Sequence, residues 1–223
     1  MARGLNVDRV VAAAVELADE DGLAAVSMAR VAERLGFTTM SLYRHVRNKD
    51  ELVWRMLDRA LGPAPEFAVP DWRAGMDRWA RELRAAVKRH PWCIDVPITG
   101  ELATFSQLSW LDRGLQALSS TGLELGEQAE LVLLLNGYVF WAVRIEMSMA
   151  AAPPQPLIPV EIDLDAVPFV REAVNARAFE DEPDRDRDFN FGLERVLDGI
   201  GVLVDQRSSP RPVPPSLPRT SSK

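Results

Sequence analysis

The stretch Gly36–Leu52, which reads GFTTMSLYRHVRNKDEL, constrains the fold most. Its first residue ends one short helical pattern, and Thr38 or Thr39 can cap the next, which is barely two turns long. Asn48 can then cap a further helix, with Glu51 three residues later as its reciprocal partner. A short helix, a tight glycine turn, a second short helix and a capped exit together predict a helix-turn-helix.

The same stretch has a charge balance unlike that of the whole chain. No Asp or Glu occurs from Gly36 to Lys49, but Arg44, His45 and Arg47 do. The protein has 33 acidic and 26 basic residues, a formal net charge of −7. A window without acids suits a surface that approaches phosphate, because each carboxylate there would repel it.

The charge also divides the chain into two parts. Residues 1–62 hold nine basic and nine acidic residues, whereas residues 63–223 hold 17 basic and 24 acidic residues. The second part would repel DNA, so we expect any nucleic-acid contact in the first. Gly62–Pro70 is rich in breakers and marks the predicted boundary between a domain at 1–62 and a larger one at 63–206.

Helical periodicity runs through the rest of the sequence. Apolar residues recur at spacings of three and four, and no alternating strand pattern of any length occurs, so we predict an all-α fold. Residues 207–223 are rich in proline and are predicted to form a disordered tail. The expected helices lie at 7–21, 28–35, 39–45, 49–61, 71–90, 102–118, 126–150, 165–179 and 191–204. The helix at 126–150 is apolar nearly all round, which predicts burial on more than one side.

Composition excludes several classes of protein. Cys93 is the single cysteine, so neither an intramolecular disulfide nor a multi-cysteine zinc site can form. Nucleotide-binding, metalloprotease, hydrolase and redox signatures are missing from the sequence, so we expect no enzyme, cofactor or metal. The N-terminus lacks a secretory apolar segment, and apolar runs such as Leu131–Leu135 are too short to span a bilayer. A cytoplasmic protein without a membrane partner is expected.

Residues 5–62 resemble the tetracycline-repressor (TetR) family of helix-turn-helix transcription regulators. The match runs from GLAAVSMARVAERLG to SLYRHVRNKDEL, and its most specific part is the pattern formed by Tyr43, His45, Lys49 and Leu52. The stretch FNFGLERVLDGIGVLV also resembles the closing helix of the family's C-terminal domain. The resemblance implies a homodimer that places two recognition helices in successive major grooves of double-stranded DNA. It further implies a C-terminal domain that binds a small molecule and dimerises.

The resemblance assigns DNA-contacting roles to ten positions. Ala29 and Met40 are apolar where some family members place base-reading polar residues, so the operator sequence does not follow from them. The exposed face of the recognition helix would carry Thr38, Thr39, Met40, Ser41 and Arg44. Phosphate-contact positions would be occupied by Tyr43 and Lys49, with His45 beside them. Further backbone or base contacts would come from Ser27 and Met28, which open the second helix.

Each assignment has a plainer alternative. Lys49 begins a helix, where a cation is unfavourable unless an anion is near, so it can clamp phosphate or be an ordinary exposed lysine. The hydroxyl of Tyr43 can bind phosphate while its ring packs in the core. Arg44 can read guanine or grip the DNA backbone, and Met40 can touch a thymine methyl or pad the helix. His45 fits a motif histidine better than a catalytic base, because no partner nucleophile accompanies it.

Aromatic and polar residues of the second part indicate a ligand pocket. The aromatic candidates are Trp79, Phe105, Trp110, Phe140 and Trp141, and for each of them core packing is the alternative. Asn136, Arg144 and Glu146 are polar groups in an otherwise apolar helix, where an unpaired buried polar group costs about 1–3 kcal/mol. They should therefore face a ligand or a dimer seam, unless Arg144 pairs locally.

These features predict a ligand-responsive transcriptional regulator that binds a palindromic operator as a homodimer and is released by a small-molecule effector. Repression, rather than activation, follows from what is most common in the family. Helices 126–150 and 187–205 would form the bundle between subunits. The alternatives are a helical small-molecule-binding or protein-interaction module without operator binding, and a cofactor-free enzyme that uses the aromatic pocket.

Overall fold

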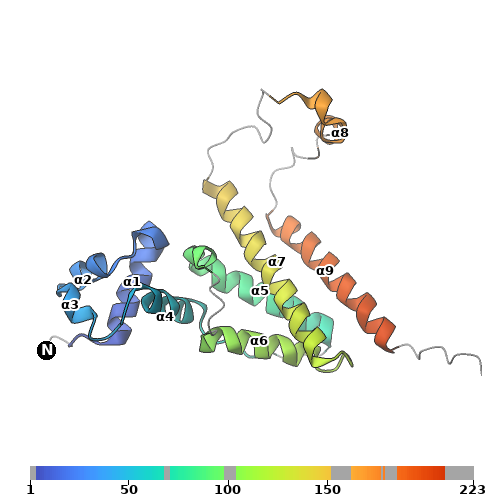
Figure 1. The fold of residues 1–223 in the computed structure, drawn as a ribbon. Helices are drawn as coiled ribbons and strands as arrows, with labels where there is room; N and C mark the ends of the chain where they lie inside the picture. Colours follow the sequence, from blue (N-terminus) through green and yellow to red (C-terminus); the bar gives the residue numbers. More distant parts are fainter. Residues whose placement is uncertain are drawn as a thin grey trace, which may run out of the picture.

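The computed structural model describes residues 4–67, 71–97, 104–151, 162–176, 178 and 185–208. Within these ranges the chain forms α-helices and short 3₁₀ helices without a strand, which confirms the all-α prediction (Figure 1). Helices α1–α4 form a small unit, which we call the head, and α5–α7 with α9 form a larger bundle, which we call the body. Helix α8 (Pro168–Asn175), preceded by η3 (Leu164–Ala166), lies beyond the ends of α7 and α9 in Figure 1.

The head consists of α1 (Val7–Asp21), η1 (Leu23–Ala25), α2 (Met28–Leu35), α3 (Thr39–Leu42) and α4 (Lys49–Leu61). Three of its helices are N-capped, because the side chains of Asn6, Ser27 and Asn48 each accept a hydrogen bond from the backbone N–H three residues on, as predicted for Asn48. Gly36 ends α2 with φ of 72°, a left-handed conformation that favours glycine. The predicted helix-turn-helix is therefore present.

Two local details of the head differ from the prediction. Helix α3 is a single turn, and the Thr38 hydroxyl bonds the Ser41 hydroxyl (2.9 Å) instead of capping a backbone N–H. The Glu51 carboxylate reaches back past the cap residue to the N–H of Arg47 (2.8 Å). The chain between α3 and α4 is thus pinned one residue earlier than a capping box would pin it.

A one-turn helix cannot persist alone, so its neighbours must hold α3. Leu42 supplies the anchor: it is fully buried, as are Leu52 and Met56 of α4 and Val31 of α2. These side chains belong to one continuous core that joins the head to the body. Leu42 is therefore the core residue that holds α3 in place.

The body is built on α5 (Trp72–Arg89), α6 (Phe105–Leu118), α7 (Leu125–Ala151) and α9 (Arg185–Ser208), with η2 (Pro91–Asp95) after α5. Trp79 lies at its centre, with its ring edge-on to that of Trp110 and its Nε1–H donated to the Trp110 carbonyl (2.8 Å). Helices α6 and α7 approach closely at Gly114, where a Cβ atom would lie 2.7 Å from a methyl of Val132. Glycine is required at that crossing.

The connection between head and body is packed against α6. The Trp110 Nε1–H donates to the Gly62 carbonyl (3.1 Å), and the Ala64 N–H donates to the Ser109 hydroxyl (2.8 Å). Arg113 lies over the ring of Phe67 at 5.6 Å. The breaker-rich sequence therefore makes a fixed turn rather than a loose linker.

An internal ion-pair cluster ties α5, α7 and α9 together. Arg84 pairs with Glu146 (3.0 Å) and Asp186 (2.8 Å), and Lys88 also pairs with Glu146. Burial acts to raise the pKa of Glu146, but the hydrogen bonds from Lys88 and Arg84 outweigh it and the pKa is lowered. The predicted exposure of Glu146 to a ligand or a dimer seam is wrong, because its charge is used inside the body.

Several predicted helix boundaries need correction. Helix α9 begins at Arg185, so the end of the charged run 180–188 is helical, and the predicted helix 165–179 is divided into η3 and α8. Of the predicted tail 207–223, the first two residues belong to α9 and the rest lie outside the described residues. Arg207 extends α9 by pairing with Glu127 of α7, a contact that sequence alone does not reveal.

Helix α7 differs most from its prediction. Burial on more than one side is wrong for the single chain, because Leu133, Leu134, Trp141 and Ile145 are exposed. By length and composition alone, Leu125–Ala150 could cross a bilayer, with 22% of its most apolar window buried. The prediction concerned uninterrupted apolar runs such as Leu131–Leu135, and charged residues such as Glu130 and Arg144 interrupt the longer helix.

Candidate nucleic-acid interface and ligand cavity

The recognition segment presents most of the predicted residues at the surface of the head. Met40 is 73% exposed and Tyr43 47%, and Thr38 and Arg44 are exposed as well. Thr39, Ser41 and His45 are half-buried, so they border this surface. The single turn of α3 therefore offers a mixed polar and apolar face, held from behind by Leu42.

The two residues that open α2 are placed differently. The Ser27 hydroxyl accepts the Arg30 N–H (3.2 Å), so it is engaged as a cap. The Met28 side chain is buried, 7% exposed, in the core of the head. A groove contact by the Met28 side chain is therefore not supported, because its apolar stem is more stable in the core.

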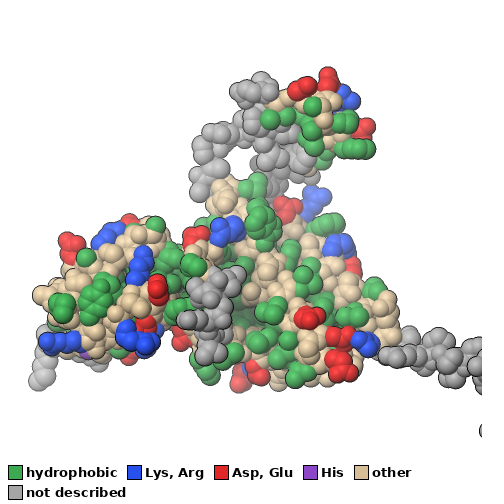
Figure 2. Space-filling model, viewed as in Figure 1, with side chains coloured by type: hydrophobic (Ala, Val, Ile, Leu, Met, Phe, Trp, Pro, Cys, Tyr) green, Lys and Arg blue, Asp and Glu red, His purple; other side chains and the backbone are tan. Residues whose placement is uncertain are grey.

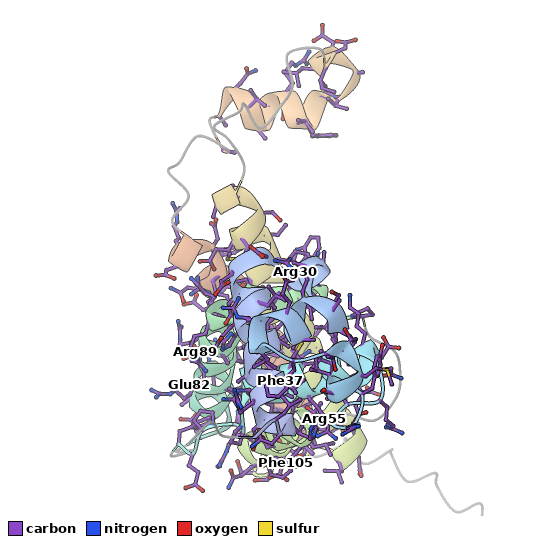
Figure 3. The ribbon with its side chains drawn as sticks, turned by 90° about the vertical axis from the view of Figure 1, so that its left-hand side faces the viewer. Arg30, Phe37, Arg55, Glu82, Arg89 and Phe105 are labelled. Carbon is purple, nitrogen blue, oxygen red and sulfur yellow. The ribbon has the colours of Figure 1, made fainter. Side chains whose placement is uncertain are left out.

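Phe37 is a surface residue that the sequence analysis missed. It follows the turn glycine, is 39% exposed, and has the guanidinium of Arg9 at 6.0 Å from its ring centre. Figure 3, which faces the head, shows Phe37 near the middle of this face between Arg30 and Arg55. The signal available in the sequence was an apolar residue at a turn that does not fit the helical spacing of the core residues.

Charges on the head fall into two groups. Arg30, Arg34 and Arg55 each pair with an acid of the head, at 2.6 Å to Asp21 for Arg30 and 2.8 Å to Glu51 for Arg55. Arg44 and Lys49 form no ion pair with any residue that the structure describes. A cation without an internal partner can bind phosphate without first breaking a contact.

Glu51 fixes the chain that leads from α3 into α4. Its pKa is lowered to about 2, first by the hydrogen bond from the Arg47 backbone N–H and then by the Arg55 guanidinium. The side chain is 17% exposed. The charged form of Glu51 therefore holds the segment that carries His45 and Lys49.

Glu51→Gln is expected to destabilise the protein by about 1–2 kcal/mol at pH 7, because hydrogen bonds to a charged acceptor are lost. The folded pKa of about 2 lies below the ordinary 4.5, so this stabilisation is complete above pH 4.5 and is lost as pH falls toward 2. Urea unfolding from pH 7 to pH 3 should show wild type and variant converging. A gap that stays constant over this range would contradict the prediction.

A cavity of about 590 Å³ lies between α4 of the head and α5, α6, α7 and η2 of the body. Six of the seven predicted ligand residues line it: Trp79, Trp110, Asn136, Phe140, Trp141 and Arg144. The indole N–H groups of both Trp79 and Trp110 are already donated to backbone carbonyls. The aromatic side chains therefore offer apolar surface to a ligand. The volume of the cavity suits a drug-sized molecule.

Phe105 is the exception among the predicted ligand residues. It is 73% exposed and does not line the cavity formed by the described residues, although it belongs to α6. It is the first residue after the Thr104 capping box, on the side of α6 away from buried Trp110 and Leu118. The helical periodicity indicated the correct helix but the wrong face.

Polar groups of the cavity are few. Arg144 donates to the Ile94 carbonyl and lies 3.4 Å from Asp95, so it pairs locally with η2 while lining the cavity. The Asn136 side chain makes no hydrogen bond to the part of the chain that the structure describes. Burial raises the pKa of the Cys93 thiol to about 12, so this lining residue is a neutral apolar group rather than a nucleophile.

The sequence analysis missed the lining residues from α4 and η2, notably Trp54, Leu57 and Ile94. They come from elements on both sides of the junction and meet only after folding. Apolar side chains gather at this boundary on the face shown in Figure 2. The cavity wall therefore includes part of the head.

Two polar tethers connect the head to the same wall. One oxygen of Asp19 on α1 accepts hydrogen bonds from His90 Nδ1 (2.8 Å) and Trp92 Nε1 (2.7 Å). Asp58 on α4 accepts the Ser106 N–H (2.9 Å) through its carboxylate, and its carbonyl accepts the Ser106 hydroxyl (2.8 Å). His90 thus ends α5 and also bonds to the head. Both contacts therefore join the head to elements that line the cavity.

Comparison with known families decides the assignment. Residues 10–56 match the family described as bacterial regulatory proteins, tetR family, and residues 64–204 match the tetracyclin repressor-like C-terminal domain. The chain belongs to the tetracycline-repressor family. Its TetR membership confirms the resemblance seen in Tyr43, His45 and Lys49, and it confirms the expectation of a regulator rather than an enzyme.

Individual TetR relatives match over most of this chain. The HTH-type transcriptional repressor DrrR1 of Streptomyces coeruleorubidus is 38% identical, over 91% of this chain and 80% of its own length. The class D tetracycline repressor of Escherichia coli is 26% identical over 92% of both chains. Apo ActR of Streptomyces coelicolor superposes with a TM-score of 0.76 at 25% identity, covering 92% of this chain and 99% of ActR.

Proposed function

We propose that this TetR-family protein is a repressor that binds a palindromic operator as a homodimer and releases it when a small molecule fills the cavity. The observation that carries the proposal is the shared wall: α4 and η2 line the cavity and also hold the head. ActR has also been solved in complex with (S)-DNPA, so ligand binding occurs on a related TetR body. The operator-binding unit would span 1–62 and the ligand-binding unit 63–206.

Base and phosphate contacts would come from the exposed face of the head. Met40 and Arg44 would reach base edges, and Tyr43 and Lys49 would bind phosphates beside them. Support comes from the lack of an internal ion pair at Arg44 and Lys49 among the described residues. The alternative is a module that does not bind an operator. In such a module, two unpaired cations on an exposed surface would have no function.

The exposed apolar strip of α7 would form the dimer seam. Leu134, Trp141, Ile145 and Met149 recur at spacings of seven, four and four, so they lie on one face of the helix, and all are exposed in the single chain. A contiguous apolar face of this kind normally marks an interface. We infer that a second copy covers it in a cytoplasmic protein, since Glu130 and Arg144 on α7 would be costly in a bilayer.

Release would follow from the geometry of the dimer. Two heads reading successive major grooves must lie about 34–36 Å apart. A ligand that prefers the state with a different spacing lowers operator affinity by its differential affinity for the two states. The tethers at Asp19 and Asp58 would carry the shift from the cavity wall to the heads.

Lys49→Ala tests the operator function. Binding to a fluorescent duplex from upstream of the protein's own gene should weaken on all sequences alike, and the salt slope should become shallower by about one for each Lys49 engaged. The slope is measured by anisotropy titration at several salt concentrations. Arg78→Ala, which removes a cation of α5 paired with Glu82, is the matched control and should leave the slope unchanged. An unaltered slope for Lys49→Ala would remove the phosphate contact.

A further inference from the structure

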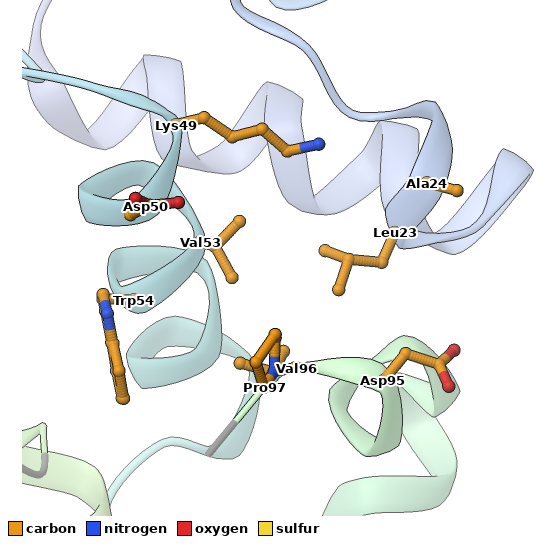
Figure 4. A pocket seen from close by; sticks show the side chains of 9 residues that line it. All are labelled: Leu23, Ala24, Lys49, Asp50, Val53, Trp54, Asp95, Val96 and Pro97. Atoms are coloured by element: carbon orange, nitrogen blue, oxygen red, sulfur yellow. The ribbon is translucent and has the colours of Figure 1, made fainter. Parts of the chain in front are cut away.

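A second cavity, of about 420 Å³, lies at the junction of head and body (Figure 4). Its apolar wall consists of Leu23, Ala24, Val53, Trp54, Val96 and Pro97. Figure 4 shows Lys49 extending over it from the start of α4 toward η1, with Asp50 beside Lys49 and Asp95 on the opposite side. The volume lies in the range of small-molecule sites, and both units contribute walls.

The charged side chains around this junction cavity differ in whether an opposite charge lies near them. Asp95 lies 3.4 Å from the Arg144 guanidinium. Asp50 is in the first turn of α4, where the helix N-terminus stabilises negative charge. Lys49 occupies the same helix start, where positive charge is disfavoured, and it forms no ion pair within the described ranges. Lys49 is therefore the only cation among the described residues that line the cavity, and it has no acidic partner there.

We propose that the junction cavity binds an amphipathic organic anion, with its apolar body against Trp54 and Val96 and its carboxylate or sulfonate at the Lys49 ammonium. The site is distinct from the larger cavity, although Trp54, Val96 and Pro97 line both and form a shared wall. An apolar body gains affinity from burial, and the anion supplies the partner that Lys49 lacks.

Occupancy of this site would act on DNA binding by a second route. The proposal here rests on the phosphate contact of Lys49 in the proposed function, because anion and phosphate would compete for one ammonium. Since η1, α4 and the chain after η2 all contribute walls, the cavity also changes when the head moves relative to the body. Ligand and operator therefore weaken each other's binding by the same factor.

The test uses two probes with the same rings: 1-anilinonaphthalene-8-sulfonate, which is anionic, and N-phenyl-1-naphthylamine, which is neutral. Calorimetry of the full chain without DNA should find two sulfonate sites per protomer, and Leu23→Trp, which fills the junction cavity, should leave one. Lys49→Gln, a surface change, should weaken the junction site for the sulfonate by about two- to fivefold and leave the neutral probe unchanged. Arg44→Gln, a head cation outside the cavity, should alter neither probe.

Binding of the sulfonate that is identical in wild type, Leu23→Trp and Lys49→Gln would overturn the proposal. Wild-type titrations are then repeated with the duplex from upstream of the gene, which should weaken one sulfonate site and leave the other. Loss of one site in Leu23→Trp together with no displacement by DNA would establish the cavity site and overturn its competition with phosphate. That outcome would count against the Lys49 contact in the proposed function and not against the cavity.

Discussion

Leu134→Asp is expected to convert the proposed dimer into a monomer and to lower operator affinity by about 10²–10⁴-fold. The side chain is 57% exposed in the single chain and lies within the apolar strip of α7. In a dimer, a carboxylate there would be buried without a partner, and two copies would face each other across the symmetry axis. Separate heads then bind half-sites independently, and the gain from linking two binding modules is lost.

Sedimentation velocity of the purified variant checks the assembly, and anisotropy titration of the operator duplex checks the affinity. Leu125→Asp is the control, because Leu125 is an exposed leucine of α7, 67% exposed, that lies on the opposite side of the helix from the strip. It should remain dimeric and bind normally. A Leu134→Asp protein that sediments as a dimer would place the seam elsewhere.

Gly114→Ala is expected to destabilise the body by about 1–3 kcal/mol through overpacking. The new Cβ would lie 2.7 and 2.8 Å from the two methyls of Val132 and 3.4 Å from Nε1 of Trp79. Val132 is a short, branched side chain, 2% exposed, so it has no room to move away. The strain falls on the crossing of α5, α6 and α7, which also forms the cavity wall.

Urea unfolding followed by tryptophan fluorescence measures this loss. Gly126→Ala, at a helical glycine with open space around it, should change stability by less than about 1 kcal/mol. Adding Val132→Ala to Gly114→Ala should cost less than the sum of the two single variants, because the smaller side chain makes room for the new methyl. If the losses in free energy of unfolding were additive, the contact between position 114 and Val132 would not be the cause of the destabilisation.

Local sequence signals predicted much of this fold correctly. A cap needs only residues within one turn, so the Asn48 side chain makes the expected hydrogen bond, and Asn6, Ser27 and Asp71 cap their helices in the same way. The recognition segment is local for the same reason. Its motif therefore identified an exposed face before any packing was known, although Thr39, Ser41 and His45 only border that face, and Met28 of α2 is buried.

Features that depend on packing were harder to predict. The sidedness of α7 could not follow from a helix that is apolar nearly all round, because its moment does not point to one face. Phe105 and Trp54 show the same limit from opposite directions. Phe105 was predicted to line the cavity but is exposed, whereas Trp54 lines the cavity without having been predicted. Neither position can be assigned from the sequence, because the cavity forms only when α4 packs against α6.

The head and the body contribute different parts of the wall of the large cavity, and this has an evolutionary consequence. The head supplies Trp54, Leu57 and Leu61, whereas α5, α6, α7 and η2 supply most of the remaining described wall. None of the residues from Thr38 to Lys49 lines this cavity in the described part of the chain. If the large cavity is the effector site, as proposed, substitutions that change which molecule is sensed can accumulate in the body while the DNA target stays constant. A duplicated gene could acquire a new inducer and still control the same promoter.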